Sequence, residues 1–128
     1  MRPASRYPTE LELEILKVLW RDGPAPVRHV REALATARDL AYTSVMTVMN
    51  IMTEKGYLSR ARKRGVYVYR PRITRQWTAR RILGDVVDRV FDGSATAVML
   101  HLIESGQIND AELESLRKLL EDRVEDEP

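Results

Sequence analysis

Small polar residues recur on one side of a predicted helix: Thr43, Ser44, Thr47 and Asn50. Spacings of three and four place Thr43, Thr47 and Asn50 on one helix face, with Ser44 on its flank. An asparagine can pair with adenine, and a threonine methyl group can contact the methyl group of thymine. The chemistry predicted is therefore the reading of base edges in DNA. A solvated helix face would have the same composition, so this interpretation depends on the neighbouring segments.

Basic side chains on those neighbouring segments could neutralise phosphate groups. Lys63-Arg64-Gly65 is a turn sequence between two β-rich runs, which places its charges at the tip of a hairpin. Each lysine or arginine that binds a phosphate releases counterions and favours association. A hairpin tip that is merely solvated is the alternative. The predicted phosphate contacts are Arg28, Arg31, Tyr42, Arg62, Lys63 and Arg64.

Residues that could perform catalysis or hold a metal are scarce. The two histidines, His29 and His101, lie in different predicted segments, and neither has a partner at ligand spacing. The sequence has no cysteine, which excludes disulfides and thiolate metal sites. It also has no glycine-rich phosphate loop and no Ser/His/Asp combination. We therefore expect a protein that is not an enzyme and binds no cofactor.

Residues 1–72 are predicted to form a winged helix-turn-helix domain. Thr9 and Glu12 form a capping box that begins the first helix, and a short second helix follows a Gly-Pro segment. The third helix spans about residues 42–55 and the hairpin about residues 57–70, where the apolar period changes from helical to alternating. The third helix would enter the major groove and the hairpin would lie on phosphates.

Residues 73–128 are predicted to form a helical dimerisation region, so the fold class is mostly α with a small β-hairpin wing. Three amphipathic helices, separated at Gly93 and at Ser105-Gly106, offer few residues for an independent core. A two-fold interface with a second copy would bury their apolar stripes. Packing against the chain's own winged helix is the alternative. The predicted interface residues are Ile82, Val86, Val90, Phe91, Met99, Leu102, Leu113, Leu116 and Leu120.

The net charge of +2 conceals a division of charge along the chain. Residues 1–82 carry 17 Lys and Arg against 7 Asp and Glu, a charge of +10, whereas residues 83–128 carry 4 against 12, a charge of −8. The first part can neutralise DNA, and the second would be repelled by it. No apolar run is long enough to insert into a membrane, and no signal peptide is recognisable. We expect a cytoplasmic protein.

Five short segments occur in an order and at spacings that match a known family. They are residues 19–30 (LWRDGPAPVRHV), 41–49 (AYTSVMTVM), 54–58 (EKGYL), 68–71 (VYRP) and 90–94 (VFDGS). They resemble the LW…GP…VREV, YTTVMTVL, EKGYL, YRYSP and LFDGS segments of the penicillinase repressor (BlaI/MecI) family. This resemblance implies a dimeric DNA-binding repressor with an N-terminal winged helix and a C-terminal helical dimerisation region.

The chain also departs from the family pattern. Ile51 stands where family members commonly carry Arg, so the family's usual operator is not carried over. Related copper-responsive repressors have a cysteine-rich tail that this chain lacks, so copper sensing is not implied. Family members are often encoded beside a membrane sensor protease triggered by β-lactams. The resemblance therefore suggests such a protease, or its effector, as a partner, and release from DNA by proteolysis in the C-terminal region.

The main functional hypothesis is a dimeric transcriptional repressor that binds a pseudo-palindromic operator in double-stranded DNA. One alternative is a winged-helix protein-interaction module whose basic face docks an acidic partner. The other is a regulator that senses a small apolar ligand between its C-terminal helices. A gel shift with the upstream region of its own gene distinguishes DNA binding from the protein-interaction alternative.

Overall fold

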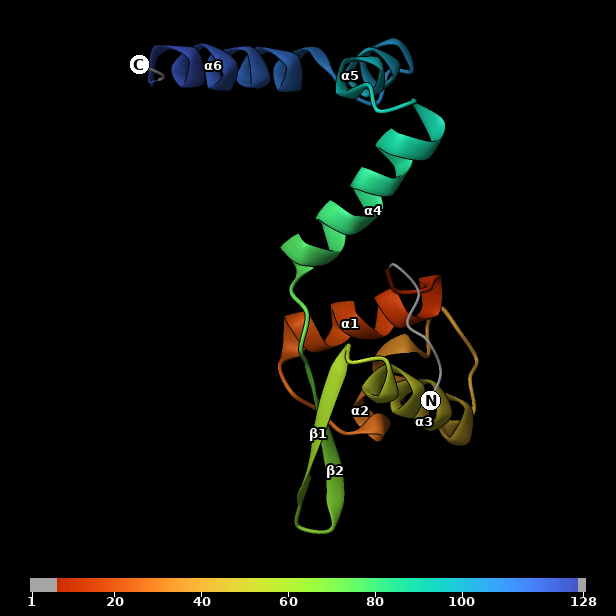
Figure 1. Ribbon diagram of the computed structural model, residues 1–128. Coiled ribbons are helices and arrows are strands. Elements are labelled where there is room, and N and C mark those ends of the chain that lie inside the picture. The colour runs from red at the N-terminus through yellow and green to blue at the C-terminus, as the bar shows by residue number, and fades with distance from the viewer. Residues whose placement is uncertain (1–6, 127–128) are drawn as a thin grey trace. The chain divides into compact units, whose positions relative to one another are not determined.

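The computed structural model describes residues 7–126, which form helices and one β-hairpin (Figure 1). The predicted fold class, mostly α with a small hairpin in a winged helix-turn-helix order, is confirmed. The elements are α1 (Glu10–Asp22), α2 (Val27–Leu34), α3 (Tyr42–Glu54), β1 (Leu58–Lys63), β2 (Val66–Pro71), α4 (Arg75–Val90), α5 (Ala95–Glu104) and α6 (Asp110–Asp126).

The capping box predicted for α1 is present. The backbone N–H of Thr9 donates to Glu12 Oε1 at 2.8 Å, and the backbone N–H of Glu12 donates to Thr9 Oγ1 at 3.2 Å. Glu12 Oε2 also lies 2.9 Å from Lys55 Nζ, with the Glu12 side chain 3% exposed. This ion pair joins the start of α1 to the end of α3, and either charge alone would be buried without a partner.

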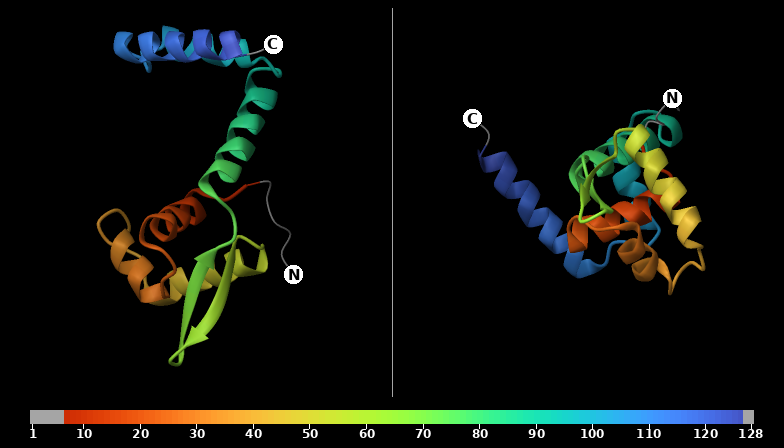
Figure 2. Two further views of the ribbon diagram at one scale, coloured as in Figure 1. Left: turned by 90° about the vertical axis from the view of Figure 1, so that its left-hand side faces the viewer. Right: turned by 90° about the horizontal axis from the view of Figure 1, so that it is seen from below.

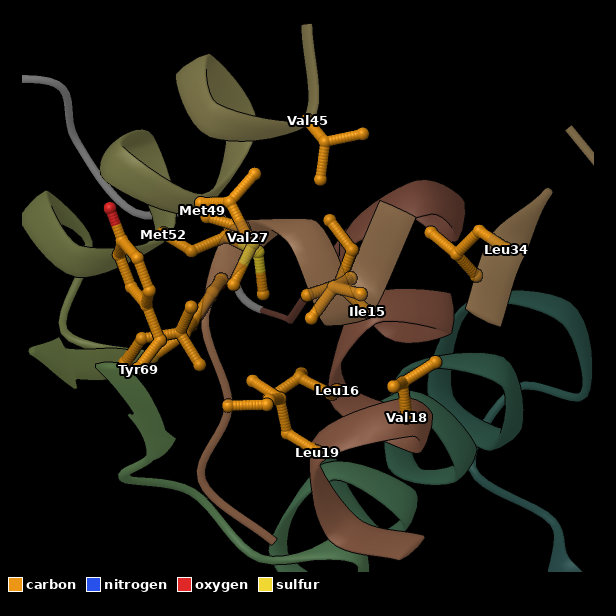
Figure 3. Close-up of a cluster of buried hydrophobic side chains, with 14 residues drawn as sticks. Ile15, Leu16, Val18, Leu19, Val27, Leu34, Val45, Met49, Met52 and Tyr69 are labelled. Atoms are coloured by element: carbon orange, nitrogen blue, oxygen red, sulfur yellow. The ribbon is translucent and has the colours of Figure 1, made fainter. Parts of the chain in front are cut away.

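Helices α1, α2 and α3 and the base of the hairpin enclose one hydrophobic core (Figure 3). Met49 and Met52 of α3 are fully buried in this core, where flexible side chains adapt to irregular gaps. The core fixes which face of α3 is turned outward. Its buried residues are Ile15, Leu16, Val18, Leu19, Ala25, Val27, Val30, Leu34, Val45, Met49, Met52, Tyr57, Leu58 and Tyr69.

The hairpin has a two-residue turn at its tip and a third partner at its base. Arg64 and Gly65 have φ angles of 52° and 78°, as a type I′ turn requires at its two central positions. At the base, Tyr69 in β2 forms an isolated bridge with Ala25, in the segment between α1 and α2. The tip extends away from the three helices (Figure 2), so the turn is available to a partner.

The division between compact units falls between Leu83 and Gly84, eleven residues beyond the boundary predicted between residues 72 and 73. The start of α4 is anchored to α1, because Trp20 Nε1 donates 3.0 Å to the carbonyl oxygen of Ile73 and Thr78 is 2% exposed. These contacts extend the first compact unit into α4. The predicted functional division at residue 72 stays a prediction.

In the second compact unit, from Gly84 onward, side chains cap the starts of α5 and α6. Ser94 Oγ accepts from the backbone N–H of Ala97 at 3.1 Å, and Asn109 and Glu112 form a reciprocal pair at the start of α6. Helix α5 has no buried residue. Among the described residues, no helix is both long and apolar enough to cross a membrane. The exposed large apolar residues here are Val86, Val90, Met99, Leu100, Ile103, Leu119, Leu120 and Val124.

Candidate nucleic-acid interface

The outward face of α3 is lined by small polar side chains. Val45 and Met49 are fully buried, which turns Thr43, Ser44 and Thr47 to the surface, where all three are exposed. Thr47 Oγ1 donates to the carbonyl oxygen of Thr43 at 2.9 Å. With its proton used in this way, the Thr47 side chain can offer a base only an oxygen lone pair and a methyl group. This suits contact with a thymine methyl.

The first turn of α3 has no side-chain cap. Ala41 occupies the N-cap position and accepts no side-chain hydrogen bond, so the first N–H groups are left to water or to an anion. Tyr42 lies in the same turn and is 45% exposed. The structure thus places Tyr42 beside N–H groups that suit a phosphate.

Arg28 and Arg31, the two arginines of α2 predicted to bind phosphates, have different partners within the protein. Arg28 Nε lies 3.3 Å from Glu32 Oε1, and both side chains are largely exposed. Such a pair is weak and can be exchanged for a phosphate. Arg31 Nε donates 3.0 Å to the carbonyl oxygen of Leu40. Arg31 therefore also connects α2 to the segment that leads into α3.

Positive charge on the hairpin extends beyond its tip into strand β1. Arg62, Lys63 and Arg64 are exposed, as predicted for the wing. The guanidinium groups of Arg60 and Arg62 lie 4.3 and 5.4 Å from the ring centroid of Tyr67. The strand register places these three residues on one face of the hairpin. We call Arg60, Tyr67 and Arg62 the guanidinium stack.

Asn50 differs from the other polar residues of α3, because its side chain is half-buried and bound to the hairpin. Its Oδ1 accepts a hydrogen bond from Tyr69 Oη at 2.6 Å and another from Arg60 Nη1 at 2.7 Å. A guanidinium group can only donate, so the atom that faces Arg60 must be the amide oxygen. Pairing with adenine through both amide atoms would require this oxygen to be free.

Arg60 and Tyr67 were not among the site residues predicted from the sequence. A signal was nevertheless present, because a two-residue turn at Arg64-Gly65 fixes the strand register. That register pairs Arg62 with Tyr67 and places Arg60 two residues along on the same face. The pattern predicts a hairpin face on which arginines of β1 lie opposite tyrosines of β2.

Among residues 7–126, no group of histidine and carboxylate side chains is arranged to hold a metal ion. His29 Nε2 lies 2.8 Å from Asp22 Oδ2, and Arg21 Nε donates to Asp22 Oδ1 at 2.7 Å. The bond from Arg21, followed by that from His29, lowers the pKa of Asp22 well below its usual range. His101 packs edge-on against Phe91 with ring centroids 5.8 Å apart.

Several known proteins are similar to this chain. The transcriptional regulator BlaI of Mycobacterium tuberculosis is 34% identical over 113 residues, which cover 87% of this chain and 80% of that protein. The penicillinase repressor of Bacillus licheniformis is 23% identical over 114 residues, 89% of each protein. The solution structure of monomeric Bacillus licheniformis BlaI with the blaP half-operator has a TM-score of 0.49 and 23% identity, and covers 59% of this chain and 92% of that chain.

The profile of the penicillinase repressor family matches residues 8–122. This match confirms the resemblance inferred from five short segments. The family consists of transcriptional repressors, which confirms the prediction that the protein is not an enzyme. The chain belongs to the penicillinase repressor family.

Proposed function

We propose that this protein is a cytoplasmic, dimeric repressor that binds a pseudo-palindromic operator in double-stranded DNA. The observation that carries the proposal is the exposed Thr/Ser face of α3 beside a hairpin whose tip carries three basic residues, Arg62, Lys63 and Arg64. Both lie in the part of the chain with a charge of +10. A helix that reads bases and a wing that neutralises phosphates are the two components that specific binding needs.

In this proposal, Thr43, Ser44 and Thr47 contact base edges in the major groove. The hydroxyl groups of Thr43 and Ser44 can donate or accept, whereas Thr47 offers a lone pair and a methyl group that can contact thymine. Ile51, half-buried on the flank of α3, adds only apolar contact. The operator preference is therefore expected to depend on apolar and hydroxyl contacts more than on arginine–guanine pairs.

Phosphate contacts come from elements on both sides of α3. Arg28, Arg31 and Tyr42 would bind one strand near the start of α3, and the tip of the hairpin would bind the other side of the groove. Contacts of this kind fix the register of the protein on the duplex without reading sequence. The phosphate-binding tip comprises Arg62, Lys63 and Arg64.

The second unit would hold two copies together through its exposed apolar side chains. Val90 and Leu120 are 67% and 60% exposed in the single chain, which favours a partner that covers them. The charge of −8 on this part of the chain keeps it from competing for DNA. The proposed interface comprises Ile82, Val86, Val90, Phe91, Met99, Leu102, Leu113, Leu116 and Leu120.

Release from DNA would follow cleavage between the C-terminal helices, by a sensor protease or its effector. Two linked winged helices bind tightly because the second binds at high effective concentration. A cut removes that gain without altering any DNA contact. The segments at Asp92-Gly93-Ser94 and Ser105-Gly106-Gln107 are exposed and lie between helices, as protease sites usually do.

A gel shift with the region upstream of its own gene tests DNA binding, with a salt titration on the same fragment. We expect retention of this fragment over random DNA and a steep loss of affinity with salt. Equal retention of random DNA, or no retention, would contradict operator binding. Capture of an acidic protein in the absence of DNA binding would favour the protein-interaction module instead.

A further inference from the structure

We infer that Asn50 is a positioning residue, which ties the hairpin to α3 and thereby presents the guanidinium stack of Arg60, Tyr67 and Arg62 to the DNA backbone. This inference rests on the proposed DNA binding. It reassigns a residue that the sequence alone places among the base readers. It also adds Arg60 and Tyr67 to the surface that contacts DNA.

The first observation is that the oxygen of Asn50 is fully used within the protein. Tyr69 and Arg60 donate to it at 2.6 and 2.7 Å, which accounts for both of its lone pairs. Only the amide N–H groups of Asn50 remain for another partner. An asparagine held in this way cannot pair with adenine through oxygen and nitrogen together.

The second observation is that Tyr69 is a fixed anchor. Its ring is 1% exposed within the core, and its hydroxyl points toward α3 (Figure 3). Its backbone exchanges two hydrogen bonds with Ala25, at 3.0 and 2.9 Å. The hydroxyl therefore ties Asn50 of α3 to the base of the hairpin.

The third observation is that Arg60 is held on two sides while remaining on the surface. Asn50 accepts from its Nη1, and the ring of Tyr67 lies 4.3 Å from its guanidinium carbon. Arginine loses much rotamer entropy when it binds a phosphate from a disordered start. The two contacts already restrict the rotamers of Arg60, so less entropy is lost on binding. Its other N–H groups remain available to phosphate oxygens.

Four variants of the full-length protein, measured on the fragment that the wild type retains, test the inference. Tyr69→Phe removes only a buried hydroxyl that cannot touch DNA, Asn50→Ala releases both donors, and the double variant combines them. Thr53→Val is the matched control, because it removes a hydroxyl that donates at 2.9 Å to Met49 within α3. Circular dichroism and thermal unfolding establish that each variant is folded.

We expect Tyr69→Phe to weaken operator binding roughly threefold and Asn50→Ala roughly tenfold, as loss of one and two hydrogen bonds would. The double variant should bind like Asn50→Ala, because both changes break the same connection. Asn50→Ala should also lower the slope of log K against log salt by about 0.9, the value for one phosphate contact. Thr53→Val should bind like the wild type.

Arg60→Gln provides a second measurement that does not depend on the core, because Arg60 is exposed. It should lower the salt slope by about 0.9, and it should lower it no further in the Asn50→Ala background. If Tyr69→Phe keeps the wild-type affinity and Asn50→Ala loses only its preference for one A·T pair, Asn50 is a base reader and the inference is wrong. If the wild type itself retains no DNA, the proposed function fails instead.

Discussion

The two compact units of this chain use apolar residues in opposite ways. Residues 7–83 bury many of their aliphatic and methionine side chains in one core, where positions such as Ile15 and Met49 are 0% exposed. Residues 84–126 have well-capped helices but leave Val90, Leu120 and Val124 60% exposed or more. These helices have satisfied hydrogen bonds at their capped starts, but their apolar side chains lack the tertiary packing that stabilises a helix.

Charge follows the same division. The first part of the chain has a charge of +10 and the second −8, so the closed unit is the one suited to DNA. The open unit is the one suited to a second copy of the chain. In the proposed function, the unit that holds bases in register needs a rigid core, whereas the unit that pairs can leave its core to be completed by its partner.

Among the variants that test this comparison, Leu116→Asp should have the largest effect, on dimerisation and operator affinity. An unpaired carboxylate in an apolar interface disfavours association, so the variant should sediment as a monomer. Loss of the link between two DNA-binding units should lower operator affinity by about a hundredfold to ten-thousandfold. Lys118→Asp, a larger charge change on the opposite face of α6, is the control and should remain dimeric. A dimeric Leu116→Asp variant would place the interface elsewhere.

Leu16→Ala should have the next largest effect, on the stability of the closed unit. Leu16 is 0% exposed, and a cavity of this kind lowers the free energy of unfolding by about 2–5 kcal/mol. Leu119→Ala, at a residue that is 59% exposed, should lower it by less than about 0.5 kcal/mol. Urea unfolding in the monomeric Leu116→Asp background makes the comparison. Equal losses would mean that the second unit has a core of its own.

Local features were predicted from the sequence because their causes are local. The capping box of Thr9 and Glu12 depends on two residues that lie three apart. The hairpin was predicted from the turn sequence Lys63-Arg64-Gly65, which lies between two β-rich runs. Such features need no knowledge of how the elements pack.

Contacts between distant segments were not predicted, because they depend on that packing. Asn50 appears on the polar face of α3, yet the hairpin folds back and its Tyr69 and Arg60 take up the asparagine oxygen. The ion pair of Glu12 with Lys55 joins residues 43 apart. Spacing along a helix predicts the face on which a side chain lies. It does not predict which residues from distant segments contact that face.

Thr47→Ala should have a smaller effect, and this effect should be confined to the preference for the operator over random DNA. Removal of a base contact should cost about 1–3 kcal/mol on the operator and much less on random DNA. Thr47→Val keeps a γ-methyl group in place and removes the hydroxyl that donates to Thr43. If the methyl group makes the contact, the valine variant should retain most of the operator preference. Equal losses on operator and random DNA would reduce Thr47 to a positioning role.

The smallest expected effect comes from the wing tip, where Lys63→Gln is combined with Arg64→Asn. Arg64 has a φ of 52° and precedes Gly65, and asparagine tolerates this conformation and is favoured before glycine in a type I′ turn. The hairpin should therefore keep its geometry while losing two charges. The slope of log K against log salt should fall by about 1.8, at about 0.9 for each phosphate contact.

This loss should be the same on operator and random DNA, because phosphate contacts carry no sequence information. Lys118→Gln, which removes a positive charge from the acidic part of the chain, should leave the slope unchanged. Titration of Kd against salt concentration for the three proteins makes the comparison. A wild-type slope in the wing variant would show that the hairpin tip does not lie on the phosphates. The positive charge would then have to act through α2, the start of α3 and the guanidinium stack.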